Sequence, residues 1–341
     1  IDLALKKLDT AIEKAWDEDQ KIPLTYFRND VVDYHPIELP VSNDKKKSNN
    51  NEKELPGFRA RKFQQTTLPL FLEGPVHYLR CYPDKERAIA LARNIRESEL
   101  YDAKLKMYKV NASLKNQPME IGRTRVFSPG WFENESIWLH MEYKYMLELL
   151  RNELYDEFFK DFKNVFIPFF NPEIYGRSIL ENSSFIVSSA NPDPSIHGNG
   201  FVARLSGATA EFISILFLMM TGSKPFFINQ KGELQLQFTP VLPEWLFTKT
   251  ACKIRLHHEK QWQVVDIAAC SFSFMFLGKI FVTYHNPTMK ATFGREAVKP
   301  AHWKITDDTG KHHTFQGEVL NGDIVTLIRN RQVTRIEIEL E

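Results

Sequence analysis

The stretch from Ser206 to Gly222 constrains the fold of this chain more than any other feature. It is apolar at nearly every position, with Glu211 and Ser214 as the main exceptions. A Ser at the start can cap free backbone N–H groups, and a Gly at the end accepts the left-handed conformation past a helix. A helix that is apolar on all sides is buried in protein or spans a membrane, and spanning needs roughly 20 apolar residues. The sequence therefore predicts a buried helix over 206–221.

The N-terminus of this helix is a predicted anion site. Its unpaired N–H donors and the positive end of its dipole favour an anion such as phosphate. Gly198, Gly200 and Arg204 lie just ahead of it in the chain. An ordinary capped core helix explains the same pattern, because most caps bind nothing. Both interpretations stay open from these residues alone.

Size and charge narrow the class of protein. A length of 341 residues predicts two domains, or one large barrel with an appendage, at about 150 residues per domain. The net charge of +1 argues against a general nucleic-acid or membrane-surface role. The 3 cysteines form no CxxC pair, so we expect neither a disulfide framework nor a zinc site. With no secretory signal at Ile1, we expect a reducing, cytoplasmic location.

Helical patterns come first in the chain and strand patterns follow. Apolar residues at helical spacing predict helices over 1–20, 65–80, 84–99, 136–151 and 154–165. Short alternating runs predict strands over 233–238, 253–257, 271–284, 303–306, 324–329 and 333–340. The polar, charged run at 42–54 predicts a solvated loop. This order predicts a mixed α+β protein with a helical domain over 1–242 and a β domain over 243–341.

The segment from Phe127 to His140 is the richest polar cluster. Glu133 and Glu135 beside an imidazole fit general acid–base work on a glycosidic bond, which usually needs two carboxylates. Two acids just ahead of a predicted helix at Ser136 also favour its N-terminus electrostatically. Spacing alone does not separate these two interpretations.

A polar stripe and a group of aromatic residues accompany that cluster. Within the predicted helix, polar residues recur at every fourth position and either line a cavity or face water: Ser136, His140, Lys144 and Glu148. Aromatic residues crowd the preceding turn, as they do where sugar rings stack or where a core is filled: Phe127, Trp131, Phe132 and Trp138.

The other histidines are weaker candidates. His257-His258 and His312-His313 are adjacent pairs in predicted strands or turns, where neighbours point to opposite faces, so they make poor metal ligands. His197, in the loop that leads to the predicted anion site, either contributes there or belongs to a surface loop. We expect no metal and no cofactor.

Three segments in order resemble cellobiose phosphorylase and its relatives. Pro129-Gly130 is followed by Glu133-Asn134, and His140 comes six residues after Asn134. Residues 205–210, Leu-Ser-Gly-Ala-Thr-Ala, are similar to the Leu-Thr-Gly-Thr-Ala-Ala segment of that family. The stretch 226–245 is similar to a strand and Pro-x-x-Trp ending that precedes a C-terminal β-sandwich in the family.

The resemblance implies a fold and an activity. The fold is an α/α barrel of the six-hairpin type, partial here, followed by an antiparallel β-sandwich. The activity is inverting phosphorolysis of a β-linked glucoside or oligosaccharide, a glycosyltransferase-type reaction of carbohydrate metabolism that yields a sugar 1-phosphate. The resemblance also implies inorganic phosphate as a co-substrate, held by His140, Ser206 and Gly207, and we expect Arg204 to assist. The sugar is contacted by Glu133 and, we expect, by Asn134, Phe127 and Trp131.

The departures from the family pattern also carry expectations. Phe127 stands where the family has Tyr and Phe132 where it has Lys, so we expect a different acceptor-sugar site. A Gln expected near Ser189 is absent, and so is the Asp-Trp-Asn-Asp segment with the family's general acid. The predicted helices are about half of what a closed barrel of hairpins needs, and half a barrel exposes apolar faces. We therefore expect the C-terminal part of a larger enzyme, completed by an N-terminal segment or a partner chain; a homodimer is a further expected assembly.

Two other functions compete with the phosphorylase. A glycoside hydrolase on the same barrel would use Glu133 or Glu135 to activate water. A non-catalytic carbohydrate-binding or scaffold protein would need no acid at all. Release of free sugar without phosphate identifies the hydrolase.

Overall fold

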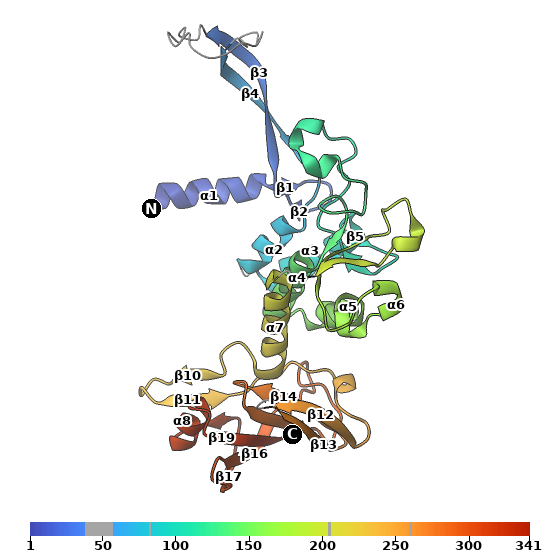
Figure 1. The fold of residues 1–341 in the computed structure, drawn as a ribbon. Coiled ribbons are helices and arrows are strands. Elements are labelled where there is room, and N and C mark those ends of the chain that lie inside the picture. The colour runs from blue at the N-terminus through green and yellow to red at the C-terminus, as the bar shows by residue number, and fades with distance from the viewer. Residues whose placement is uncertain (38–56, 82, 204–205, 259–260) are drawn as a thin grey trace, which may run out of the picture. The chain divides into compact units, whose positions relative to one another are not determined.

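The computed structural model describes residues 1–37, 57–81, 83–203, 206–258 and 261–341, which form a mixed α+β structure. The chain divides into two compact units, Ile1–Thr209 and Ala210–Glu341. The division falls inside helix α7 (Ser206–Thr221), whereas the sequence places a boundary at residue 242. The predicted loop at 42–54 lies outside the described residues. Figure 1 shows the elements of each unit.

Unit 1 (Ile1–Thr209) contains most of the helices. They are α1 (Asp2–Lys14), α2 (Glu73–Arg80), α3 (Lys85–Glu97), α4 (Leu139–Arg151), α5 (Tyr155–Val165) and α6 (Pro172–Tyr175). Its strands are β1 (Trp16–Asp17), β2 (Ile22–Pro23), β3 (Phe27–Ile37), β4 (Gly57–Thr67), β5 (Tyr101–Asp102), β6 (Met107–Tyr108), β7 (Ile137–Trp138), β8 (Ser183–Ile186) and β9 (Gly200–Ala203). Short 3₁₀ turns are η1 (Met119–Ile121), η2 (Arg123–Arg125), η3 (Ile167–Phe169) and η4 (Pro194–Ile196).

Helix α4 is the centre of unit 1, and α2, α5 and β8 pack against it. All but a few of its residues are buried, including both tyrosines, Tyr143 and Tyr145. The predicted start at Ser136 is wrong, since the helix begins at Leu139. Residues 137 and 138 instead form β7, which pairs with β8, because their β-branched and aromatic side chains suit a buried strand pair.

The predicted polar stripe on α4 does not face water. Ser136 precedes the helix, and Glu148 has no exposed side-chain surface. The Glu148 carboxylate accepts from Arg80 at 3.0 Å and from Arg151 at 2.8 Å. A buried charge is tolerated when ion pairs compensate its desolvation, and two guanidinium groups do so here.

The N-terminal part of unit 1 departs from the predicted helices. The helix predicted over 1–20 is α1, which ends at Lys14 and has no buried residue. The helix predicted over 65–80 is wrong at its start: residues 65–67 end strand β4, which pairs with β3 in a long antiparallel ribbon (Figure 1). Pro75 lies in the first turn of α2, where a missing N–H costs little. Asp84 caps α3 as predicted, accepting from the Arg87 N–H at 3.0 Å.

Unit 2 (Ala210–Glu341) is mostly strands. They are β10 (Phe226–Ile228), β11 (Leu234–Gln237), β12 (Cys252–His258), β13 (Gln261–Ile267), β14 (Ser271–Phe276), β15 (Ile280–His285), β16 (Pro300–Asp307), β17 (His312–Gln316), β18 (Val319–Leu320) and β19 (Val333–Leu340). The 3₁₀ turn η5 (Glu244–Leu246) and helix α8 (Asp323–Arg329) complete it.

A five-stranded sheet in the order β14-β15-β19-β16-β17 organises unit 2. It is mixed and not purely antiparallel as predicted, because β15 and β19 run parallel. The strand predicted over 324–329 is wrong: it is helix α8, in which the buried Ile324 and Val325 lie one turn before the buried Ile328. The strand predicted over 333–340 is confirmed as β19.

Helix α7 has the predicted bounds but not the predicted burial. Gly222 ends it with φ +82°, and a Cβ there would lie 1.9 Å from the Thr239 hydroxyl, so only Gly fits. Ala208, Ile215 and Met219 are buried along one face. Ile213 on the other face is 59% exposed, so the prediction of a helix buried on all sides is wrong in this chain.

No barrel is detected among the described residues, and the partial α/α barrel and the β-sandwich stay predictions. Of the helices that the structure describes, none combines the length and the apolar character needed to cross a bilayer.

Candidate functional site

A tight loop carries the predicted sugar-contacting residues. Gly130 has φ +74°, and a Cβ on it would lie 2.7 Å from the backbone nitrogen of Asn191. The Asn191 side-chain amide donates to the Pro129 carbonyl at 3.1 Å, and the Asn134 amide donates to the Phe127 carbonyl at 2.7 Å. A side chain at position 130 would be strained and would also collide, so this Gly sets the shape of the loop.

Asn111, which has no exposed surface, fixes the acidic part of the loop. Its amide donates to the Glu133 carbonyl at 3.0 Å, and its side-chain oxygen accepts from the Glu135 N–H at 2.6 Å. The Glu135 carbonyl in turn accepts from the Ser188 hydroxyl at 2.5 Å. The two glutamates are therefore held in place from elements far away in the sequence.

Glu133 and Asn134 each keep one buried oxygen without a hydrogen-bond partner. One Glu133 oxygen accepts from Arg123 at 2.9 Å, while Oε2 is buried and unpartnered. The side-chain oxygen of Asn134 is also buried and unpartnered, although its amide is satisfied. Most buried polar atoms in proteins are hydrogen-bonded, so these two oxygens are free acceptors that a ligand hydroxyl or a water can use.

Glu135 differs from Glu133. Its carboxylate pairs with Lys109 at 3.3 Å, and both side chains are about nine-tenths buried. The Lys109 ammonium group occupies one of the two carboxylate oxygens of Glu135. The interpretation that Glu133 and Glu135 stabilise a helix N-terminus is wrong, because α4 begins only at Leu139 and Glu142 is the acid of its first turn.

The aromatic residues of the loop form one cluster. Trp131 contacts Phe185 and Phe201 edge-on, with ring centroids 5.3 and 4.6 Å apart. Phe127 contacts Phe132 at 4.9 Å. These contacts account for Trp131 and Phe127 as packing residues, and both keep partly exposed surface. Their predicted role in sugar stacking stays a prediction.

Trp138 connects the loop to His140. Its indole N–H donates to the Phe132 carbonyl at 2.8 Å, and its ring meets the His140 ring edge-on at 5.7 Å. His140 lies in the first turn of α4, and its Nδ1 is buried and has no hydrogen-bond partner. The loop and this imidazole thus form one continuous group of residues.

His140 also faces the start of α7. A Cβ built on Gly207, the second residue of that helix, would lie 3.5 Å from Cβ and 3.9 Å from Cγ of His140. Residues 140 and 207 therefore lie side by side, as the predicted anion site requires. Arg204 lies outside the described residues, and so does the side chain of Ser206.

The protonation state of His140 follows from its surroundings. Burial lowers the pKa of the imidazole below its usual 6.5, the positive charge of Lys144 lowers it further, and Glu73 partly opposes them. The ring is therefore neutral at pH 7 and can donate one N–H. The same Lys144 charge favours an anion bound beside the ring.

His197 is fully engaged elsewhere in unit 1. Its Nδ1 lies 2.7 Å from the Lys104 ammonium, and its Nε2 lies 2.8 Å from the Asn191 carbonyl. Both ring nitrogens are used in fixing the loop, which favours the structural interpretation of this residue. The sequence gives no signal for Asn111, Lys109 or Arg123, because they stand 10 or more residues before the acids they contact and belong to no recognisable motif.

No protein-family model matches this chain, and no curated protein sequence matches it significantly.

Proposed function

We propose that this chain is the phosphate-binding C-terminal part of an inverting glycoside phosphorylase that acts on a β-linked glucoside. The observation that carries the proposal is the buried, unpartnered Nδ1 of His140 next to Gly207 in the first turn of α7. A helix N-terminus with a neighbouring imidazole N–H is a suitable arrangement for a phosphate ion. The proposal includes a cytoplasmic location and a barrel completed by an N-terminal segment or a partner chain.

The phosphate is held by donors from two helices. The backbone N–H groups at the start of α7, which include that of Gly207, have no partner within the helix. They point along the axis toward the anion, and the helix dipole adds to the attraction. The neutral His140 ring donates one further hydrogen bond, and the nearby Lys144 charge contributes a longer-range attraction.

The glucosyl residue is held by the loop. Oε2 of Glu133 and the side-chain oxygen of Asn134 are acceptors without partners, and sugar hydroxyls are the donors that suit them. Arg123 keeps the other Glu133 oxygen occupied at 2.9 Å and so orients the carboxylate. Asn111 holds the backbone on which Glu133 stands.

The proposed reaction is a single displacement. A phosphate oxygen forms a bond to the anomeric carbon as the bond from that carbon to the glycosidic oxygen breaks, with inversion from β to α. A general acid donates a proton to the leaving oxygen. We assign this general acid to the N-terminal segment or partner chain that completes the barrel. Glu135 does not supply it, since its carboxylate is engaged by Lys109.

Phosphate binding tests the proposal directly. Titration of inorganic phosphate into the 341-residue chain by calorimetry is expected to show one site. His140→Ala removes one hydrogen bond to a charged ligand, worth about 1.5–3 kcal/mol, and is expected to weaken binding by about 10- to 150-fold. His197→Ala is the matched control, because that ring is engaged by Lys104 and Asn191.

Turnover separates the competing functions. With the barrel completed, the protein is expected to form a sugar 1-phosphate from a β-linked glucan only when phosphate is present. Equal release of free sugar without phosphate would identify a hydrolase. Unaltered phosphate binding in His140→Ala, or no binding by the wild type, refutes the assignment of the anion site.

A further inference from the structure

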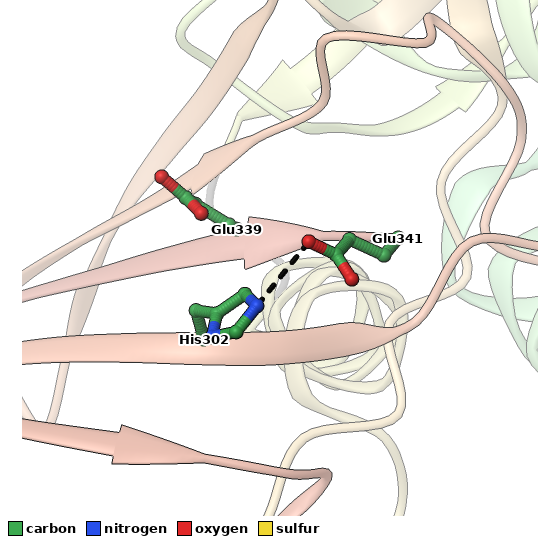
Figure 2. A group of neighbouring side chains, drawn as sticks. All are labelled: His302, Glu339 and Glu341. Atoms are coloured by element: carbon green, nitrogen blue, oxygen red, sulfur yellow. Dashed lines mark ion pairs between the residues drawn. The ribbon is translucent and has the colours of Figure 1, made fainter.

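A second group of residues, in unit 2, has the composition of a metal site. We propose that His302, Glu339 and Glu341 bind a divalent transition-metal ion, with Zn²⁺ as the best match. Figure 2 shows the three side chains on β16 and at the end of β19. The ligand atoms that they offer all lie within 4.8 Å of one another. This site is independent of the phosphate site and of the proposed reaction.

Strand register brings these residues together. β19 lies between β15 and β16, and Glu339 is paired with His285 on one side and His302 on the other. Directly paired residues point to the same face of a sheet, and so do residues two apart on one strand. The two imidazoles therefore share one face with the carboxylates of Glu337 and Glu339. These four side chains border a groove of about 890 Å³.

The charges on this face are not balanced at Glu339. Glu337 is paired with Arg335 at 3.3 Å and with His285 at 3.6 Å. The Glu339 carboxylate has neither an ion pair nor a hydrogen bond among the described residues. Among the described residues, the Glu341 carboxylate has one ion-pair contact, with the His302 ring at 3.3 Å. Two neighbouring carboxylates with one imidazole between them attract a divalent cation.

The spacing suits zinc. Bonds of about 2.1 Å in a tetrahedral site place ligand atoms about 3.4 Å apart. His302 Nε2 and Glu341 Oε1 are already 3.3 Å apart. The remaining closure, from at most 4.8 Å, requires only rotation of exposed glutamate side chains. An imidazole with two carboxylates selects zinc and similar ions over calcium, which prefers oxygen ligands alone. Three protein ligands leave the fourth position open to water.

The ion would connect two strands of the sheet. His302 stands near the start of β16, Glu339 stands near the end of β19, and Glu341 directly follows β19. Binding to the folded state alone stabilises it by mass action. Zn²⁺ is therefore expected to raise the unfolding temperature of the chain.

Calorimetric titration of Zn²⁺ into the chelator-treated, untagged chain tests this. One site is expected, and His302→Ala and Glu339→Gln should each weaken it at least tenfold. His312→Ala is the matched control on β17 of the same sheet and should bind as the wild type does. His302 is partly exposed and Glu339 is exposed. His302→Ala and Glu339→Gln should therefore keep the wild-type far-ultraviolet circular dichroism spectrum when no metal is present.

Substitution with Co²⁺ gives an independent readout. With Co²⁺ bound, the wild type should show visible absorption bands with the intensity typical of tetrahedral Co²⁺. His302→Ala should lose these bands. Absence of saturable Zn²⁺ binding overturns the proposal. So does equal binding by wild type and His302→Ala, or loss of binding in the His312→Ala control. Tighter binding of Ca²⁺ than of Zn²⁺ would also overturn it, because the imidazole would then have no role.

Discussion

The buried Glu142 makes the stability of unit 1 depend on pH, which can be tested by substitution. Its side chain has no exposed surface, and one oxygen accepts from the Tyr108 N–H at 2.7 Å while the other has no partner. Burial raises the pKa of this carboxyl well above its usual 4.5, and the negative charges of Asp161 and Asp102 raise it further, against the backbone hydrogen bond. Between pH 4.5 and this raised pKa, the folded state therefore keeps a proton on Glu142 that the unfolded state releases.

The magnitude follows from proton linkage. Below pH 4.5 both states are protonated, and Glu142 makes no pH-dependent contribution. As pH rises from 4.5 toward the raised pKa of the folded state, the unfolded state is favoured by about 1.4 kcal/mol per pH unit. Above that pKa the loss is constant. Glu142→Gln removes the titration, so the stability gained by the variant should grow with pH at this slope.

Hydrogen exchange measured by mass spectrometry on peptides of α4 reports the opening free energy of this unit separately from unit 2. After correction for the intrinsic pH dependence of exchange, wild type and Glu142→Gln should diverge between pH 5 and 7. Glu148→Gln on the same helix is the matched control. It should destabilise α4, because Arg80 and Arg151 lose their charge partner. Parallel profiles for wild type and Glu142→Gln would refute a buried, protonated Glu142.

Two further predictions concern unit 1. Arg96→Ala removes the guanidinium that contacts the buried Asp161 carboxylate at 2.6 Å, and it should lower the free energy of unfolding by about 3 kcal/mol, measured by thermal unfolding. Adding Asp161→Asn to the same chain should recover part of this loss. A loss under about 1 kcal/mol would contradict the prediction. Gly130→Ala should cost about 2 kcal/mol or more, because strain at φ +74° adds to a collision with Asn191. Gly176→Ala is the matched control, since Gly176 has a similar φ of +67° and nothing lies within 4 Å of an added Cβ, and it should cost only about 1 kcal/mol. Equal costs for the two variants would show that the collision with Asn191 is relieved.

The local sequence pattern was sufficient to predict those helices and strands whose ends or periodicity are specified by residues only a few positions apart. The end of α7 follows from Gly222, which must adopt positive φ. The start of α3 follows from Asp84, and the C-terminal half of β19 follows from the alternation of apolar and acidic residues over 336–340. Local pattern failed at α8, because a short apolar run is compatible with both a strand and a helix. It also missed the β3–β4 ribbon, whose residues are largely exposed and lack a clear period.

The sequence by itself determined which residue types are present for chemistry and placed Glu133, Asn134 and His140 in one short segment. Only the tertiary structure decided that His140 lies beside Gly207 and that Lys109 neutralises Glu135. It also decided that His302 lies near Glu339 and Glu341 across a pair of strands, because these residues are far apart in the sequence and form no local motif. The physical reason is that spacing along the chain specifies neighbours only within a helix turn or a strand. Contacts between elements depend on packing and register, which involve the whole unit.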